Sequence, residues 1–190
     1  MFKKGFFAAL AVCVLLLAAT LHFRSSYQDA QQRLAQHSYN AWGELYWLAC
    51  DAGNFSGPEE LARYEIRYGA IASSGIHPYM VPAFDASMHT LDFLSSDVYQ
   101  FLQLLAQADP DNVVTQQSFE LFQAMFEQIE DIAFFVLDYT NQGEAAMLEL
   151  IDPDSKVYQE IKTQIDECVR TYLEDIRLLT PRLSYVIETA

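Results

Sequence analysis

Five acidic side chains lie on one stretch, from Gln116 to Tyr139, whose apolar residues repeat with a helical period. They are Glu120, Glu127, Glu130, Asp131 and Asp138. Four of them recur at intervals of 7, 4 and 7 residues, which places them on one face of a helix, and Glu130 lies beside that face. Acidic side chains that point into a helical bundle can hold a pair of metal ions, provided that partner helices supply Glu-x-x-His motifs.

The histidines do not supply that motif. The chain has four, His22, His37, His77 and His89, and none has a carboxylate three residues before it. No two of them have the spacing of metal ligands. We therefore interpret the acidic face as a solvated surface, with a docking surface for a basic partner as the alternative. No metal or cofactor is predicted.

Two Asp-Pro-Asp turns, at 109–111 and 152–154, offer further carboxylate oxygens. Calcium takes roughly six to eight oxygen ligands, and neither turn is followed by the spacing of an EF-hand. An acidic cap followed by proline in the first turn is typical of the start of a helix. Both turns are therefore predicted to begin helices.

Two cysteines, Cys50 and Cys168, lie outside the apolar N-terminal segment. In an oxidising compartment they can pair, and a disulfide that closes so long a loop stabilises a fold by up to about 4–5 kcal/mol on the chain-entropy model. The alternative is two free thiols that pack as small apolar groups. No CxxC motif, nucleophile elbow or phosphate loop is present, so the sequence does not predict an enzyme.

The segment IHPYMVP, at 76–82, is the most irregular part of the chain. Its two prolines favour an extended backbone, and most of its other side chains are apolar or aromatic. It is predicted to be a connector packed under the helices. The alternative is an exposed loop in which Tyr79 and Met80 contact a partner.

The rest of the chain after residue 23 has helical periodicity, and Gly and Pro separate the periodic segments. The sequence predicts an all-α fold, in which an N-terminal membrane helix continues into an antiparallel bundle of about five helices. The first helix is expected to reach about Ala49, and Ser56 is expected to cap the next one, which begins at Pro58. The remaining helices are expected at 82–108, 116–139, 144–151 and from Val157 onwards, and Pro181 is expected to end or kink the last.

The apolar segment at 5–23, GFFAALAVCVLLLAATLHF, is predicted to be a membrane anchor. As a helix with about 1.5 Å rise per residue it reaches roughly 28 Å, close to the thickness of the hydrocarbon core. Lys3 and Lys4 precede it, so the positive-inside rule predicts that the short basic tail at 1–4 is cytoplasmic and that 24–190 is a single acidic domain outside. The alternative is a secretory signal cleaved near Leu17-Ala18-Ala19, which would leave a secreted protein.

Charge limits the possible partners. All 26 acidic residues follow residue 23, against nine of the 11 basic ones, which leaves this part with a net charge near −17. A chain without a basic surface is not expected to bind nucleic acid. No lysine or arginine lies between Tyr68 and Ser155, so we expect the first and last helices, which hold basic residues, to pack beside this acidic middle.

These observations predict a membrane-anchored, outward-facing acidic helical domain that acts by protein–protein interaction in a cell-envelope complex, with another protein as its partner and a basic protein as one candidate. The first alternative is an extracytoplasmic domain that binds a small ligand or a cation between its helices. The second is an enzyme on an unfamiliar helical scaffold. A large apolar surface patch favours a protein partner, whereas an enclosed cavity lined by acidic groups favours a ligand.

Overall fold

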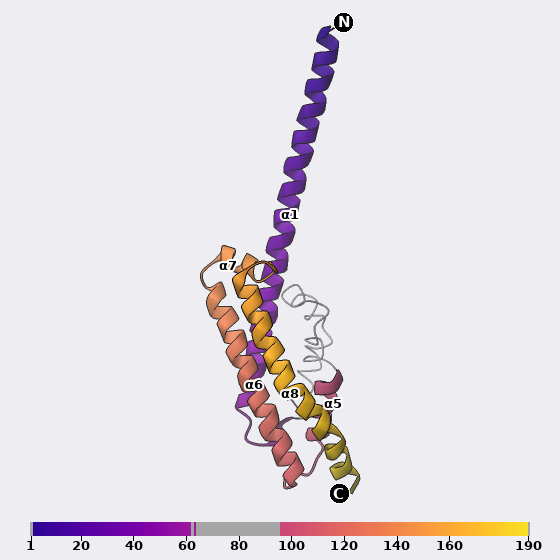
Figure 1. The fold of residues 1–190 in the computed structure, drawn as a ribbon, viewed down its shortest axis with the longest axis vertical. Helices are drawn as coiled ribbons and strands as arrows, with labels where there is room; N and C mark the ends of the chain where they lie inside the picture. The colour runs from indigo at the N-terminus through magenta and orange to yellow at the C-terminus, as the bar shows by residue number, and fades with distance from the viewer. Residues whose placement is uncertain (1, 62, 64–95, 190) are drawn as a thin grey trace.

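The structure, a computed structural model, describes residues 2–61, 63 and 96–189, and the side chains of residues 2–11, 96 and 169 fall outside that description. The described elements are α1 (Phe2–Gly53), the 3-10 helix η1 (Pro58–Glu60), α5 (Ser96–Leu105), α6 (Val113–Thr140), α7 (Glu144–Glu149) and α8 (Lys156–Thr189) (Figure 1). These residues contain no strand, which confirms the all-α prediction. The segment at 76–82, with Tyr79 and Met80, lies outside the described residues, as does the first part of the helix expected at 82–108.

α1 is one unbroken helix of 52 residues. Its N-terminal part extends alone beyond the other helices (Figure 1), and every side chain from Val12 to Ala30 is exposed. From Ala35 onwards the helix has a buried stripe and belongs to the bundle. It ends at Gly53, four residues beyond the expected end, where the Asn54 side-chain amide donates to the Cys50 carbonyl at 2.7 Å.

The length and hydropathy of the described helices bear on the membrane helix expected at 5–23. Within the part of the chain that the structure describes, no helix combines the length and the hydropathy that a membrane-crossing segment requires.

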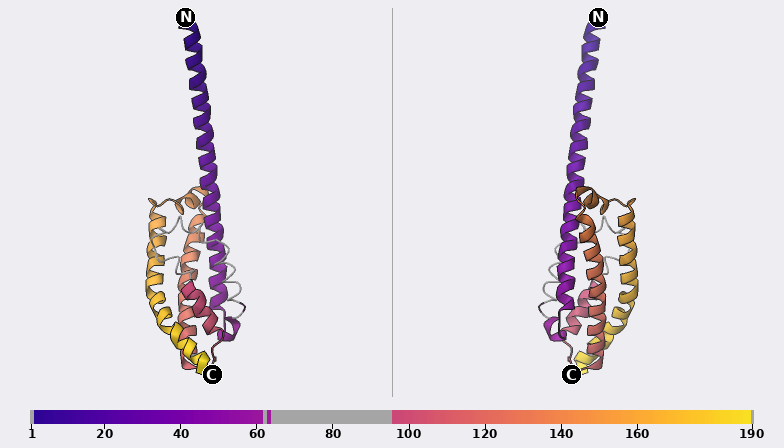
Figure 2. Two further views of the ribbon diagram at one scale, coloured as in Figure 1. Left: turned by 90° about the vertical axis from the view of Figure 1, so that its right-hand side faces the viewer. Right: turned by 90° about the vertical axis from the view of Figure 1, so that its left-hand side faces the viewer.

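α6 is the central helix, as expected from its two apolar stripes. The Asn112 side chain caps its start by accepting a hydrogen bond from the Val114 amide at 2.9 Å. α6 packs against α1 on one side and against α8 on the other, and Figure 2 shows it between them. Within the described residues, α6, the longest helix of the acidic middle, therefore lies between the first and last helices. The Arg177 guanidinium of α8 also pairs with Asp97 of α5 at 2.8 Å.

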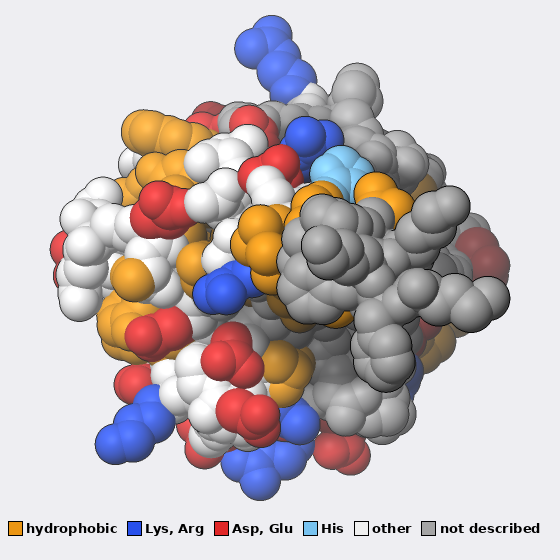
Figure 3. All heavy atoms as spheres, turned by 90° about the horizontal axis from the view of Figure 1, so that it is seen from above, with side chains coloured by type: hydrophobic (Ala, Val, Ile, Leu, Met, Phe, Trp, Pro, Cys, Tyr) orange, Lys and Arg blue, Asp and Glu red, His pale blue; other side chains and the backbone are white. Residues whose placement is uncertain are grey.

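The connection from α6 to α8 lies at the end of the bundle from which the N-terminal part of α1 projects. Gly143 has a φ of 116°, a conformation open mainly to glycine, and it turns the chain into α7, which packs on α1. Ser155 then caps α8 by accepting from the Tyr158 amide at 3.0 Å. Viewed along α1 towards this end, acidic, basic and apolar side chains are intermixed on the surface (Figure 3).

Two local expectations are corrected. Ser56 makes no cap: Gly57 is the residue before η1, and no side chain bonds the free amides there. The last helix was expected to end or kink at Pro181, and it does not end there, because Pro181 lies inside α8, which continues to Thr189. Because Pro181 is exposed, water can replace the helical hydrogen bond that a proline cannot make.

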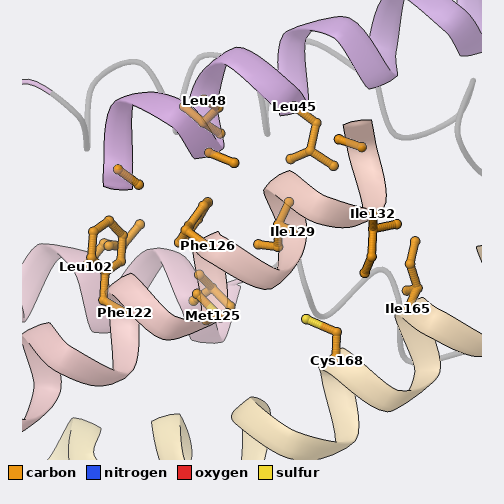
Figure 4. Close-up of a cluster of buried hydrophobic side chains, with 14 of the residues drawn as sticks. Leu45, Leu48, Leu102, Phe122, Met125, Phe126, Ile129, Ile132, Ile165 and Cys168 are labelled. Atoms are coloured by element: carbon orange, nitrogen blue, oxygen red, sulfur yellow. The ribbon is translucent and has the colours of Figure 1, made fainter. Parts of the chain in front are cut away.

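The apolar core joins all the long helices (Figure 4). It is formed by Leu45 and Leu48 of α1, Leu102 of α5, Phe122, Met125, Phe126, Ile129 and Ile132 of α6, and Ile165 and Cys168 of α8, among others. Phe122 is fully buried, with ring centroids 4.9 Å from Phe126, 6.2 Å from Phe119 and 6.4 Å from Phe55. This aromatic cluster fixes the α6 side of the core.

Candidate partner surface on α1 and α6

The acidic residues of α6 point away from the core. Glu120, Glu127, Asp131 and Asp138 are exposed, and Glu130 is half-buried on the side that faces α1. A di-metal centre requires inward-pointing carboxylates, so this geometry does not fit one. Within the described residues, no group of three or more His, Cys, Asp or Glu side chains is placed to hold a metal ion. The four exposed carboxylates form a solvated face.

Three aromatic residues lie beside this acidic face, and the sequence analysis did not identify them. Trp47 of α1 is 60% exposed and Phe134 of α6 is 57% exposed. Tyr46 lies between them, with its ring centroid 5.5 Å from that of Trp47 and 6.2 Å from that of Phe134. The three rings thus bridge the seam between α1 and α6 at its outer surface.

The acidic groups nearest to these rings follow from helix spacing. Asp131 and Asp138 lie three residues before and four residues after Phe134, so they flank it on the α6 surface. We call Tyr46, Trp47 and Phe134, together with Glu130, Asp131 and Asp138, the acidic–aromatic patch. Neither helix brings a cation to it, because no lysine or arginine occurs between Arg33 and Arg63 or within α6.

A short chain of polar contacts connects the two helices at the edge of the patch. The Tyr46 hydroxyl interacts with the Cys50 thiol, and the Cys50 thiol interacts with the Glu130 carboxylate. The pKa of Cys50 is raised above its ordinary value, first by burial, and Glu130 adds to this rise. The pKa of Tyr46 is raised, first by its interaction with Cys50. Both groups therefore stay protonated at neutral pH, and the charge here is that of the carboxylates.

The structure holds Cys50 and Cys168 as free thiols, so it contains no disulfide between them. Cys50 lies on α1 beside Glu130 of α6, whereas Cys168 lies on α8 and points towards α6 from the opposite side (Figure 4). Because α6 lies between α1 and α8, the two sulfurs are on different sides of the central helix. Cys168 is 1% exposed and acts as a small apolar core residue.

The burial of Cys168 leads to a pH-dependent stability. Burial raises the pKa of its thiol from 9.0 to about 12. Between these values the unfolded state binds fewer protons, so we expect the free energy of unfolding to fall as pH rises above 9, by up to about 1.4 kcal/mol per pH unit. Urea unfolding at a series of pH values should show a shallower fall in Cys168→Ala, because, among the described residues, only the groups with a raised pKa that remain, Cys50 and three tyrosines, then contribute to the slope. Equal slopes in both proteins would contradict this assignment.

A shallow cleft lies beside α8. It has a volume of about 550 Å³ and is open to solvent. Phe135, Tyr139, Glu149, Lys156 and Glu160 are among its lining residues, and the Tyr139 hydroxyl donates to the Glu149 carboxylate at 2.5 Å. This hydrogen bond raises the pKa of Tyr139. The cleft is neither enclosed nor lined by acidic groups alone, so it does not have the character expected of a cation site.

The fold and the surface define a class only: an all-α bundle, built around one central helix, with an acidic and aromatic outer seam. Compared with models of protein families, with curated proteins and with solved structures, the chain shows no match.

Proposed function

We propose that this protein is a single-pass membrane protein that holds an acidic helical bundle outside the membrane, where it binds another protein in a cell-envelope complex. The observation that carries the proposal is the course of α1. The large apolar side chains from Val12 to Phe23 are 55–72% exposed, on a part of α1 that projects beyond the other described helices, whereas the same helix is part of the core from Ala35 onwards.

An apolar helix that makes no contact with its own bundle needs another apolar medium, and a bilayer supplies one. The side chains of residues 5–11, the first part of the predicted anchor, lie outside the described residues, and their sequence is apolar throughout. The intermixed charges at the end of the bundle nearest to the anchor favour a domain that stands off the lipid surface (Figure 3). The first side-chain hydrogen bond from α1 to the α7 segment is made by Gln32, nine residues beyond Phe23, so about 14 Å of helix separates the predicted anchor from the bundle.

The acidic–aromatic patch supports binding of a protein more than binding of a small ligand. Tryptophan, tyrosine and phenylalanine are enriched where proteins bind one another. The described cleft on α8 is open, which is unlike the concave, largely enclosed sites that small molecules occupy. A protein partner is therefore the function that the geometry supports best.

The experiment is a test of topology with single cysteines. Cys13, Cys50 and Cys168 are replaced by alanine, and one cysteine is added either at exposed Gln117 of α6 or at Phe2, which leaves Lys3 and Lys4 in place. An impermeant maleimide should label Gln117→Cys in intact cells and Phe2→Cys only after permeabilisation. The opposite labelling would overturn the outward orientation. A soluble Gln117→Cys protein that has lost residue 2 would show cleavage and overturn the anchor.

A further inference from the structure

We infer that the acidic–aromatic patch binds a basic, amphipathic helical segment of the partner protein, with arginine side chains on the partner facing the Trp47 and Phe134 rings. The inference rests on the proposed function, because both require a protein partner. It adds where that partner binds and the chemistry of the segment that binds.

The rings supply the apolar part of the argument. Trp47 and Phe134 are more than half exposed although each belongs to a helix with a well-formed buried stripe. Their neighbour Tyr46 brings the three rings into one continuous surface across two helices. Clustered aromatic side chains of this kind act as anchors in protein interfaces, because they bury a large apolar area at a small cost in side-chain entropy.

The charges of the patch determine which charge the bound segment of the partner must carry. Glu130, Asp131 and Asp138 border the rings, and α6 has no lysine or arginine that could neutralise them. An acidic partner, or an anionic lipid surface, would be repelled from this face. A basic segment would gain both from the carboxylates and from cation–π contacts with the rings, and arginine makes such contacts more often than lysine.

The shape of the surface favours a helix as the bound segment. The patch follows the seam between α1 and α6, two helices that pack against each other. An amphipathic helix can pack along such a pair of helices when its apolar and basic side chains recur every three or four residues on one face. The expected partner segment is therefore a helix with leucine and arginine on one face.

The two tryptophans allow a direct binding measurement on the full chain in detergent micelles. The chain has Trp42, which is fully buried, and Trp47, which is exposed, so acrylamide quenching reports mainly on Trp47. The ligand is a synthetic amphipathic helix of leucine and arginine, labelled with fluorescein so that anisotropy gives its affinity independently. We expect this peptide to protect Trp47 from acrylamide and its affinity to fall as salt is raised. The matching peptide with glutamate in place of arginine should not bind.

Matched variants locate the binding surface. Trp47→Ala, Phe134→Ala and Asp131→Asn should each weaken binding, by about tenfold or more for the aromatic residues. Glu120→Gln removes a charge of the same helix face about 16 Å away along α6 and should leave the affinity nearly unchanged. A lysine peptide should bind more weakly than the arginine peptide.

Several results would overturn the inference. They are absence of binding by the arginine peptide, an equal effect of Glu120→Gln and Asp131→Asn, and protection of Trp47 by zwitterionic lipid vesicles without any peptide. The last result would indicate a lipid-binding surface. Because the topology experiment does not involve the patch, correct topology without peptide binding would leave the proposed membrane display in place and remove only the patch as its binding surface.

Discussion

The double variant Val14→Asp/Leu17→Asp should move from the membrane fraction to the soluble fraction, with its bundle still folded. Both positions lie near the middle of the predicted anchor at 5–23, and their side chains are 58% and 62% exposed. An aspartate at the centre of a membrane helix costs about 2.5–3.5 kcal/mol on insertion scales, so two of them oppose insertion by about 5–7 kcal/mol. Folding should be unaffected, because the buried stripe of α1 begins only at Ala35.

The measurement is the distribution of the protein after alkaline carbonate extraction, with circular dichroism of the released fraction. The matched control is Ser25→Asp/Gln28→Asp, which has the same spacing and the same added charge but lies between the anchor and the bundle, where both side chains are exposed. The control should remain in the membrane. If both double variants stayed in the membrane, or both were released, the segment at 5–23 would not be the anchor.

Phe122→Ala should lower the free energy of unfolding by about 3–5 kcal/mol, the usual cost of removing a buried aromatic ring. Phe122 is fully buried, and its ring lies against those of Phe55, Phe119 and Phe126. A domain of this size is stable by only about 5–15 kcal/mol. The loss is therefore a large part of the total.

Urea unfolding in detergent, followed by circular dichroism, measures this effect. The control is Phe134→Ala, which removes the same ring from the same helix at a position that is 57% exposed. It should cost less than about 1 kcal/mol, because little buried area is lost. Phe134→Ala should thus separate binding from stability, and equal losses in the two variants would contradict the assignment of Phe122 to the core and Phe134 to the surface.

The positions of the long helices followed from the sequence because burial repeats with the helical period. The two apolar stripes of the segment at 116–139 predicted that it would be covered on two sides, and α6 packs against both α1 and α8. The exposure of Glu120, Glu127, Asp131 and Asp138 followed from the same pattern, since they fall between the stripes. Periodicity predicts which face of a helix is outward, and it did so here.

The relation between the two cysteines, the effect of Pro181 and the aromatic patch could not be predicted in this way, because they depend on how the helices pack and on which residues face solvent. Cys50 and Cys168 both lie close to apolar stripes, yet only the packing order of the helices shows that α6 lies between them. Pro181 is tolerated inside α8 because its side faces solvent. Trp47 and Phe134 are adjacent through Tyr46 only in the register that α1 and α6 adopt, although each could have been noticed as an aromatic residue outside its helix's stripe.

The continuity of α1 gives the bundle a fixed angular phase relative to its anchor. No glycine or proline interrupts the helix between Phe6 and Trp42, so α1 connects the predicted anchor to the core as one continuous helix. One residue inserted between Arg24 and Arg33 would advance the bundle by 1.5 Å and rotate the acidic–aromatic patch by about 100° around the axis of α1. Seven inserted residues would restore the original direction within about 20° while lifting the bundle by roughly 10 Å. A membrane-bound partner that requires the patch to face in one direction should therefore tolerate the seven-residue insertion better than the one-residue insertion.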